Sequence, residues 1–418
     1  MTAEDLLGAV RTALAAGADD VDLVDTAARI AWSTIAEPGD AVAGELVSGL
    51  RPDRALGVVL EAADTGDVRG LVALCAEAGV AGSEDPTAFG AVLLAAVARW
   101  SPRLGRSEVG DVLAAGRAVG ARLLVPGAAG WPDRVDDLGP HAPLVLWTRS
   151  DATEQRPTLA VVGSRANTVA GAEAAAEITS AAADAGCAIT SGGAYGIDAV
   201  AHRVAIAARV PTTAVLAGGI DQLYPAGNVD LLHTVARQGA LLAESPPGTR
   251  PTRWRFLARN RLIAALGDAT VVVEAGARSG ALNTAHHAAQ LGRPVFAVPG
   301  AFSSSASVGC HRLVAQGRAQ IVVHASDPVD AATAATAAAA TATATAVSFP
   351  VSDTVEPLSA AREDPEVFRV LDALGRRAMP EHEVAVRSGM SLAEVADALA
   401  LAELQGLAVH GSGGWARA

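Results

Sequence analysis

An arginine-rich segment with two aromatic residues stands out from an otherwise acidic chain. The 418 residues carry a formal net charge of -13, yet no acidic residue lies between Glu244 and Asp268. Trp254 and Phe256 lie within the same segment. It contains five arginines, at Arg250, Arg253, Arg255, Arg259 and Arg261. Because guanidinium groups pair with phosphate and aromatic rings stack on bases, this pattern favours contact with a nucleic-acid strand. The alternative is an arginine-rich loop that is paired with neighbouring carboxylates.

Loops rich in glycine and hydroxyl side chains are the second feature that could bind an anion. Each follows a short apolar segment, and two of them precede a predicted helix, where free backbone N–H groups bind phosphate. The loops contribute the following candidate phosphate ligands: Gly163, Ser164 and Arg165; Ser191, Gly192, Gly193 and Gly196; and Ser279, Gly280 and Thr284. One such loop alone is common after a parallel strand, so the argument depends on their combination.

Several kinds of chemistry are disfavoured by composition and spacing. The chain has no lysine, which a Walker A loop and a Schiff-base enzyme both require. Asp198 and His202 are expected to brace a loop, and His286 and His287 have no matching ligands for a metal. The three cysteines are widely spaced and odd in number, which predicts neither a disulfide framework nor a zinc site. We therefore expect no catalytic residue, cofactor or metal.

The elements that would position these loops alternate between strand and helix. Seven short apolar segments read as strands, at residues 158–162, 187–190, 212–216, 240–243, 269–273, 294–298 and 320–323. Helical patterns fill the intervals, at 171–185, 198–208, 228–238, 259–266 and 284–291. Short apolar strands with helical crossovers indicate an α/β fold with a doubly wound parallel sheet, which binds ligands at the carboxyl ends of its strands. The glycine-rich loops fall at those ends.

The segments on either side predict further domains. Residues 1–115 show helical spacing and predict a small helical domain, followed by an α/β domain over 116–326. Residues 327–360 are mostly Ala and Thr and predict a linker with some possible helix, with nothing evident to anchor it in a core. Residues 361–418 predict three helices and a hairpin, which describes a winged helix. Its third helix carries acids and no arginine, which favours protein interaction over duplex binding.

No uninterrupted apolar run of about 18 residues is present, and the N-terminus is acidic, so we expect neither a membrane span nor a signal peptide. The expected location is the cytoplasm.

Seven blocks in consistent order make the chain similar to the DNA-processing protein A (DprA/Smf) family. They lie at residues 162–165, 191–202, 219–228, 244–248, 256–263, 273–285 and 292–300. The resemblance is dense from about 120 to 325. It implies an extended Rossmann-like fold between a small helical (SAM-like) domain and a winged helix. It also implies a cytoplasmic homodimer that binds single-stranded DNA and loads the RecA recombinase in transformation or recombination, without enzymatic activity.

The resemblance also implies which residues meet DNA. In this chain they are Gly163-Ser164-Arg165 and Arg259-Asn260-Arg261, to which the residue pattern adds Arg253, Arg255 and Phe256. Two positions depart from the family pattern. Ala258 stands where a basic residue usually precedes Arg259, and His311 lies where the family often has Gly-x-Asn-x-Leu-Ile.

Two enzyme classes remain as alternatives. A nucleotide-binding phosphoribohydrolase would use similar loops, with Glu274 as the plausible acid. A NAD-dependent oxidoreductase would require an acid after the strand at 212–216, where the chain has Ala217-Gly218-Gly219. The number of arginines in residues 248–263 exceeds what one phosphate requires, which argues against the phosphoribohydrolase.

Overall fold

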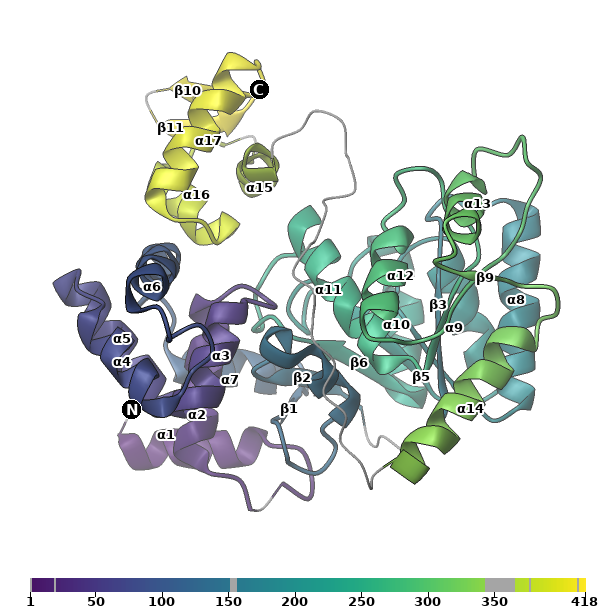
Figure 1. Cartoon of the computed structure of the whole chain (residues 1–418), viewed down its shortest axis with the longest axis horizontal. Helices are drawn as coiled ribbons and strands as arrows, with labels where there is room; N and C mark the ends of the chain where they lie inside the picture. The colour runs from purple at the N-terminus through teal and green to yellow at the C-terminus, as the bar shows by residue number, and fades with distance from the viewer. Residues whose placement is uncertain (1, 19, 151–155, 343–364, 376, 412) are drawn as a thin grey trace.

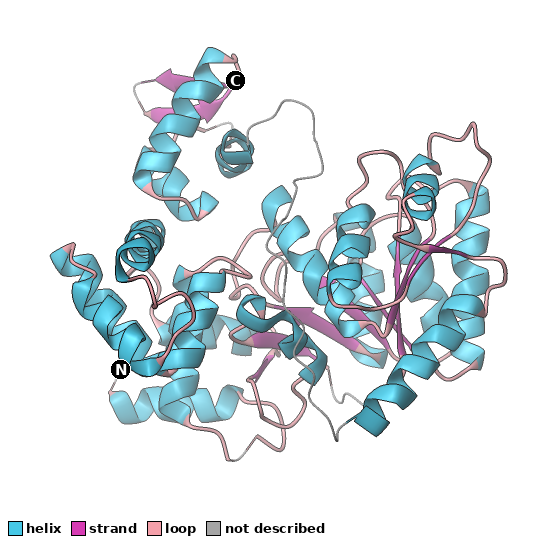
Figure 2. Cartoon of the chain, viewed as in Figure 1, coloured by secondary structure: helices cyan, strands magenta, loops and turns pink. Residues whose placement is uncertain are grey.

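The computed structural model describes residues 2–18, 20–150, 156–342, 365–375, 377–411 and 413–418. Figure 1 shows an N-terminal helical part, a central α/β part and a C-terminal unit that sits above the N-terminal helices. In Figure 2 the strands of the central part run between layers of helices. Among the described residues, no helix is long and apolar enough to cross a membrane.

The central sheet has nine strands within the described residues, in the order β1-β2-β6-β5-β4-β3-β7-β8-β9. The pairs β1–β2 and β2–β6 are antiparallel, and every later pair is parallel. The strands are β1 (Arg122–Leu124), β2 (Leu146–Arg149), β3 (Thr158–Val162), β4 (Ala188–Ser191), β5 (Thr212–Leu216), β6 (Ala240–Ala243), β7 (Ala269–Val272), β8 (Val295–Ala297) and β9 (Gln320–Ile321). The predicted doubly wound parallel sheet is confirmed.

Alternate side chains of each central strand face opposite helical layers. Leu159 and Val161 of β3 belong to the core under one layer, whereas Ala160 and Val162 belong to the core under the other. The first layer contains α8 (Val169–Asp184), α9 (Ile197–Ala207) and α14 (Asp327–Ala342), and the second contains α11 (Arg253–Leu266), α12 (Ala281–Gln290) and α13 (Val308–Ala315). Helix α10 (Val229–Gln238) covers β5 and β6. This burial on both faces explains why the strands are almost wholly apolar.

The N-terminal helices form their own core and also extend that of the sheet. Two tryptophans from different helices, Trp32 and Trp100, meet edge to face with ring centroids 5.1 Å apart. Trp147 of β2 packs with Val112 and Leu113 of α7 (Val109–Ala118) in the core shared with the sheet. The helices are α1 (Ala3–Ala13), α2 (Leu23–Ile35), α3 (Ala41–Leu50), α4 (Pro52–Thr65), α5 (Arg69–Ala78), α6 (Pro86–Trp100) and α7 (Val109–Ala118), with 3-10 turns η1 (Ser101–Arg103) and η2 (Asp133–His141).

The C-terminal unit has the predicted winged-helix architecture. Helices α15 (Pro365–Ala373), α16 (Glu381–Ser388) and α17 (Leu392–Leu404) precede a hairpin of β10 (Ala408–Gly411) and β11 (Gly414–Arg417). Its core joins all three helices to the hairpin through residues such as Val370, Val384, Leu399 and Trp415. The unit therefore has a hydrophobic core of its own.

The start of the Ala/Thr-rich segment is helical, as the prediction allowed, but it is anchored in the core, which the prediction did not expect. Residues 327–342 form α14, and Val329 and Ala332 of this helix are buried in the core beneath the sheet. Because the alanine side chain is small, an Ala-rich helix can pack close to the strands that it covers. Residues 343–360 of the predicted linker lie outside the described residues.

Candidate nucleic-acid interface

The loops after β3 and β4 are in direct contact at the carboxyl edge of the sheet. The Ile197 N–H donates a hydrogen bond to the Ser164 carbonyl at 3.1 Å. Gly196 has a φ of +78°, and a Cβ there would lie 2.1 Å from the same carbonyl oxygen. Only glycine fits this position, because both the backbone conformation and the close approach exclude a side chain. Gly163, Ser164 and Arg165 are thereby held beside the loop that begins α9.

Asp198 braces the loop after β4, as the sequence predicted. Its buried carboxylate accepts hydrogen bonds from the N–H groups of Gly192 at 3.1 Å and Ala194 at 3.3 Å. Burial raises the pKa of Asp198, while Arg259 and these N–H groups oppose the shift. Two backbone donors of the loop are consequently already occupied by the protein.

Glu274, the acid of the alternative hydrolase, is also occupied. It is buried, and it accepts hydrogen bonds from the Thr168 N–H at 2.9 Å and from the Thr168 hydroxyl. Thr168 is the N-cap of α8, so Glu274, which follows β7, ties the loop after β7 to the start of α8. This role as a brace gives no support to a phosphoribohydrolase.

The arginine-rich segment folds mainly as a helix rather than a loop. Helix α11 begins at Arg253, six residues before the predicted start, because the Thr252 hydroxyl caps it by accepting from the Arg255 N–H. Eight of its fourteen residues are buried. The structure therefore places most of these side chains against protein.

Arg259 links the helix to two strand ends. Its side chain is only 5% exposed and donates to the carbonyl oxygens of Gly192, at 2.9 Å, and Val215. A Cβ on Gly192 would lie 2.6 Å from the guanidinium, so this glycine makes room for the arginine. Burial lowers the pKa of Arg259 to about 10, against the attraction of Asp198.

Arg261 and Arg255 are held in buried ion pairs. Arg261 makes two hydrogen bonds of 2.7 Å to the Glu244 carboxylate and a third, of 2.9 Å, to the His141 carbonyl. Arg255 binds both carboxylate oxygens of Glu37, at 2.7 and 3.1 Å. Burial raises the pKa of Glu37, but Arg103 and Arg255 outweigh that effect and bring the pKa down to about 2. These two arginines follow the salt-bridged alternative, and their contact with DNA stays a prediction.

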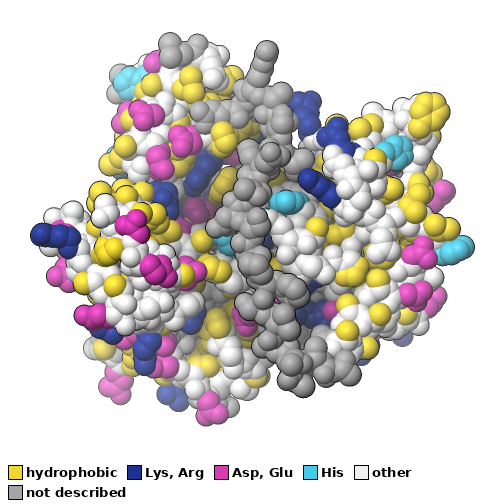
Figure 3. All heavy atoms as spheres, viewed as in Figure 1, with side chains coloured by type: hydrophobic (Ala, Val, Ile, Leu, Met, Phe, Trp, Pro, Cys, Tyr) yellow, Lys and Arg dark blue, Asp and Glu magenta, His cyan; other side chains and the backbone are white. Residues whose placement is uncertain are grey.

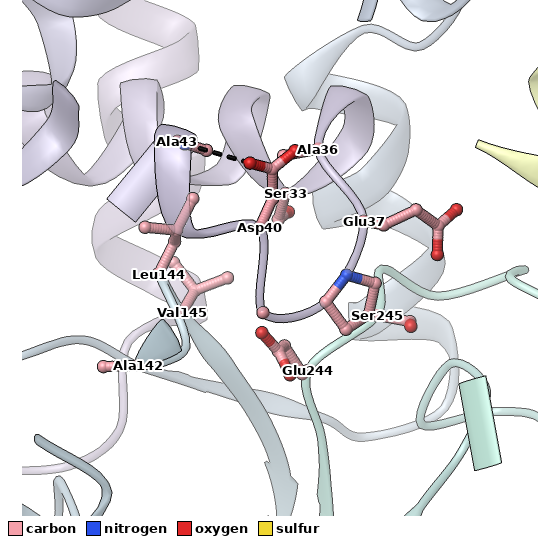
Figure 4. A pocket seen from close by; sticks show the side chains of 12 residues that line it. Ser33, Ala36, Glu37, Asp40, Ala43, Ala142, Leu144, Val145, Glu244 and Ser245 are labelled. Carbon is pink, nitrogen blue, oxygen red and sulfur yellow. Dashed lines mark hydrogen bonds between the residues drawn. The ribbon is translucent and has the colours of Figure 1, made fainter. Parts of the chain in front are cut away.

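Figure 4 shows a crevice between the turn that follows α2 and the end of β6, with Glu37, Asp40 and Glu244 around it. Its volume is about 20 Å³, room for about one water molecule. This crevice is therefore too small for a nucleotide. Glu37 and Glu244 were not predicted as partners of these arginines. Glu37 lies 218 residues from Arg255 and Glu244 lies 17 residues from Arg261, and no local pattern connects either pair.

An exposed group of rings and guanidinium remains at the loop edge. The Arg165 guanidinium carbon lies 4.7 Å from the centre of the Phe256 ring, and Tyr224 meets the same ring at 5.6 Å. Arg165 is exposed, Phe256 is half-buried and Tyr224 is 50% exposed. We call Arg165, Tyr224 and Phe256 the arginine–aromatic surface. Three further arginines near these loops are exposed, Arg250, Arg253 and Arg278.

The loop before α12 is tied to α11 by an amide. The Asn260 side chain donates to the Gly280 carbonyl at 3.2 Å and to the Asn283 side-chain oxygen at 3.3 Å. Ser279 accepts from the Ala281 N–H at 3.3 Å, and Thr284 is buried. Gly280 remains exposed at the turn. The structure thus brings the predicted loops to one edge but leaves only part of each set accessible.

The two departures from the family pattern have local explanations. Ala258 is half-buried, and its carbonyl accepts from Arg261 at 3.1 Å. His311 lies with its Nε2 atom 3.0 Å from the Gly300 carbonyl, joining α13 to the loop after β8.

His202, which was expected to brace a loop, is fully buried and contacts the Thr212 hydroxyl at 2.8 Å. It therefore braces β5 rather than the loop.

Comparisons with known proteins agree with this architecture. A family model described as DNA recombination-mediator protein A matches residues 122–333, and a model of the DprA winged helix domain matches residues 354–414. The X-ray structure of DNA processing protein A from Streptococcus pneumoniae is similar, with a TM-score of 0.54 and 26% identity. The similarity covers 73% of this chain and 96% of that one.

Curated relatives extend the comparison in sequence. The putative DNA processing protein DprA of Mycobacterium tuberculosis (strain ATCC 25618 / H37Rv) is 44% identical over 313 residues, which are 71% of this chain and 77% of that protein. Protein Smf of Escherichia coli (strain K12) is 41% identical over 160 residues, 38% of this chain and 43% of that protein. The family model covers half of the chain, and the Mycobacterium tuberculosis relative is matched over 77% of its length, so the chain belongs to the DNA recombination-mediator protein A family.

Proposed function

We propose that the chain binds single-stranded DNA at the carboxyl edge of the sheet and, as a homodimer, mediates loading of the RecA recombinase. The observation that carries the DNA proposal is the exposed arginine–aromatic surface beside backbone loops. A guanidinium that also contacts a ring suits a flexible strand, whose phosphates and unstacked bases are both accessible. The recombinase step is supported by the membership of a recombination-mediator family.

The charge distribution supports a local rather than a general affinity for polyanions. The whole chain is acidic, with a net charge of -13, so duplex and strand alike are repelled elsewhere. Figure 3 shows separate basic side chains on the parts of the upper half of this face that are drawn in colour. The exposed arginines near the loops, Arg165, Arg250, Arg253 and Arg278, would then select where the strand binds.

Arg165→Ala is expected to weaken binding of a labelled oligo-dT strand about tenfold or more, as measured by fluorescence anisotropy. A hydrogen bond to a charged group contributes roughly 1.5–3 kcal/mol, and Arg165 has no buried ion pair to lose in the structure as described. Thermal stability should stay at the parental value. The matched control is Arg54→Ala, which removes an exposed arginine from α4. Equal affinity of the parent and Arg165→Ala would place the DNA site elsewhere.

The recombinase proposal is tested by RecA assembly on DNA that is already coated with single-strand binding protein. Addition of the chain should shorten the lag before RecA-dependent ATP hydrolysis, because a mediator provides RecA with a bound strand. Arg165→Ala should lose most of this effect, whereas Arg54→Ala should keep it. An unchanged lag, with DNA binding intact, would reject the mediator step alone.

A further inference from the structure

Helix α15 of the winged helix lies on the first turn of α11. The Asp372 carboxylate accepts a hydrogen bond from the Arg253 N–H at 2.6 Å. The guanidinium carbon of Arg253 lies 3.8 Å from the centre of the Phe368 ring. Arg253 is one of the residues predicted to contact DNA, and here both its backbone donor and its side chain are engaged by another domain.

A second set of contacts holds the winged helix to the N-terminal domain. Arg103 of η1 donates to the Val386 carbonyl at 2.9 Å, and Arg106 pairs with Glu383 at 3.1 Å. Arg103 also pairs with Glu37, the carboxylate that binds Arg255 of α11. The winged helix thus contacts both α11 and the N-terminal domain, and Figure 1 shows it above the N-terminal helices.

The chemistry of the α15 contact is that expected of a nucleotide. An aromatic ring stacked on a guanidinium resembles a base, and a carboxylate at a helix N-terminus occupies the place that a phosphate favours. The neighbouring Trp254 ring is approached by Arg369 of α15, whose guanidinium carbon is 4.7 Å from the ring centre. Phe368, Arg369 and Asp372 therefore cover the start of the helix that bears the arginines.

We propose that the docked winged helix is an autoinhibitory cover, in which Phe368 and Asp372 occupy the path of the single-stranded DNA at Arg253 and Trp254. This inference rests on the proposed DNA-binding function. DNA and the docked domain then compete for the surface at Arg253 and Trp254. Single-stranded DNA must displace α15 to reach these two residues. Arg165, on the arginine–aromatic surface, stays available for the first contact.

The contact is built so that it can be released. Phe368 and Asp372 lie outside the winged-helix core, so undocking leaves that core intact. The unit carries nine acidic residues against six arginines from residue 362 onward, so it repels DNA once released. A closed state populated about 90% of the time lowers the apparent affinity about tenfold.

The test compares oligo-dT affinities of the full-length parent, Phe368→Ala and Asp372→Asn by anisotropy at one fixed salt concentration. Both variants should bind more tightly, by up to about tenfold for a cover that is closed about 90% of the time. Asp397→Asn is the matched control, because it removes the same charge from an exposed position on α17. It should bind like the parent. Small-angle scattering should show that both contact variants are more extended than Asp397→Asn.

The possible outcomes separate the cover from the proposed function. If parent and contact variants bind equally well, the cover is wrong and DNA binding stands. Weaker binding by Phe368→Ala also overturns the cover, because the domain would then contribute to the DNA site. If Asp397→Asn gains as much as Asp372→Asn, simple charge explains the effect and the cover is rejected. If neither the parent nor any variant binds oligo-dT, the proposed DNA-binding function is wrong, and the cover is rejected with it.

Discussion

Arg261→Ala is expected to lower the free energy of unfolding by about 3–5 kcal/mol, the range for breaking a buried ion pair at one partner. Arg261 is 5% exposed and holds the Glu244 carboxylate through two bonds of 2.7 Å. Its removal leaves a carboxylate at the end of β6 that is largely shielded from water and lacks its cation. The total free energy of unfolding of a domain is only about 5–15 kcal/mol, so this loss is a large share of it.

Urea unfolding followed by circular dichroism measures the effect, with Arg165→Ala as the control that should unfold like the parent. A second variant isolates the ion pair. Replacing both partners, Arg261→Met with Glu244→Leu, removes the charge without leaving its counterion, so much of the stability should return. If Arg261→Ala unfolds like the parent, the pair is not a structural element. The residue would then be free to serve DNA as first predicted.

This distinction affects how DNA-binding mutants are interpreted. Loss of DNA binding in an Arg261 variant has two explanations. The end of β6 can be displaced, or a contact with a DNA phosphate can be missing. Arg165 does not have that ambiguity, because Arg165 is exposed and its described contact is the half-buried Phe256 ring. Comparing the Arg261 and Arg165 variants therefore distinguishes an arginine that stabilises the site from one that can contact DNA directly.

The strands and their loops were predictable because the signal is local. Apolar segments such as Thr158–Val162 and Thr212–Leu216 match β3 and β5 residue for residue, since burial on both faces demands that composition. The loops follow at the carboxyl ends by the geometry of parallel sheets. Gly196 and Asp198 likewise take the tight-turn and brace roles that their residue types favour.

The partners of the arginines were not predictable, because they come from distant segments. Nothing near Glu37 indicates that it will meet Arg255 and Arg103, 218 and 66 residues away. The start of α11 was also missed, since the arginine pattern looked like a charged loop while Thr252 was in fact a helix cap. The winged helix was recognised by its own pattern, yet its docking on α11 depends on single contacts such as Arg253 with Asp372.

Acidification from about pH 6.5 to 4.5 is expected to destabilise the fold, with His202 contributing roughly 2–3 kcal/mol. The imidazole is fully buried beneath β5, and burial together with nearby Arg259 lowers its pKa to about 3. The unfolded chain has the ordinary pKa near 6.5 and takes up the proton first. The stabilisation is therefore complete above pH 6.5 and is lost as the pH falls toward 3, at about 1.4 kcal/mol per pH unit.

Urea midpoints measured at half-unit pH steps give this slope. His202→Gln should be less stable at pH 7, because it loses the 2.8 Å contact with Thr212 and its packing, yet its stability should fall less steeply with acid. His324→Gln, which alters an exposed histidine, should retain the parental slope. His287, whose pKa burial lowers to about 4, adds a smaller dependence that all three proteins share. Identical slopes for His202→Gln and the parent would mean that the imidazole takes up its proton without unfolding. The brace between α9 and the start of β5 would then be looser than the structure implies.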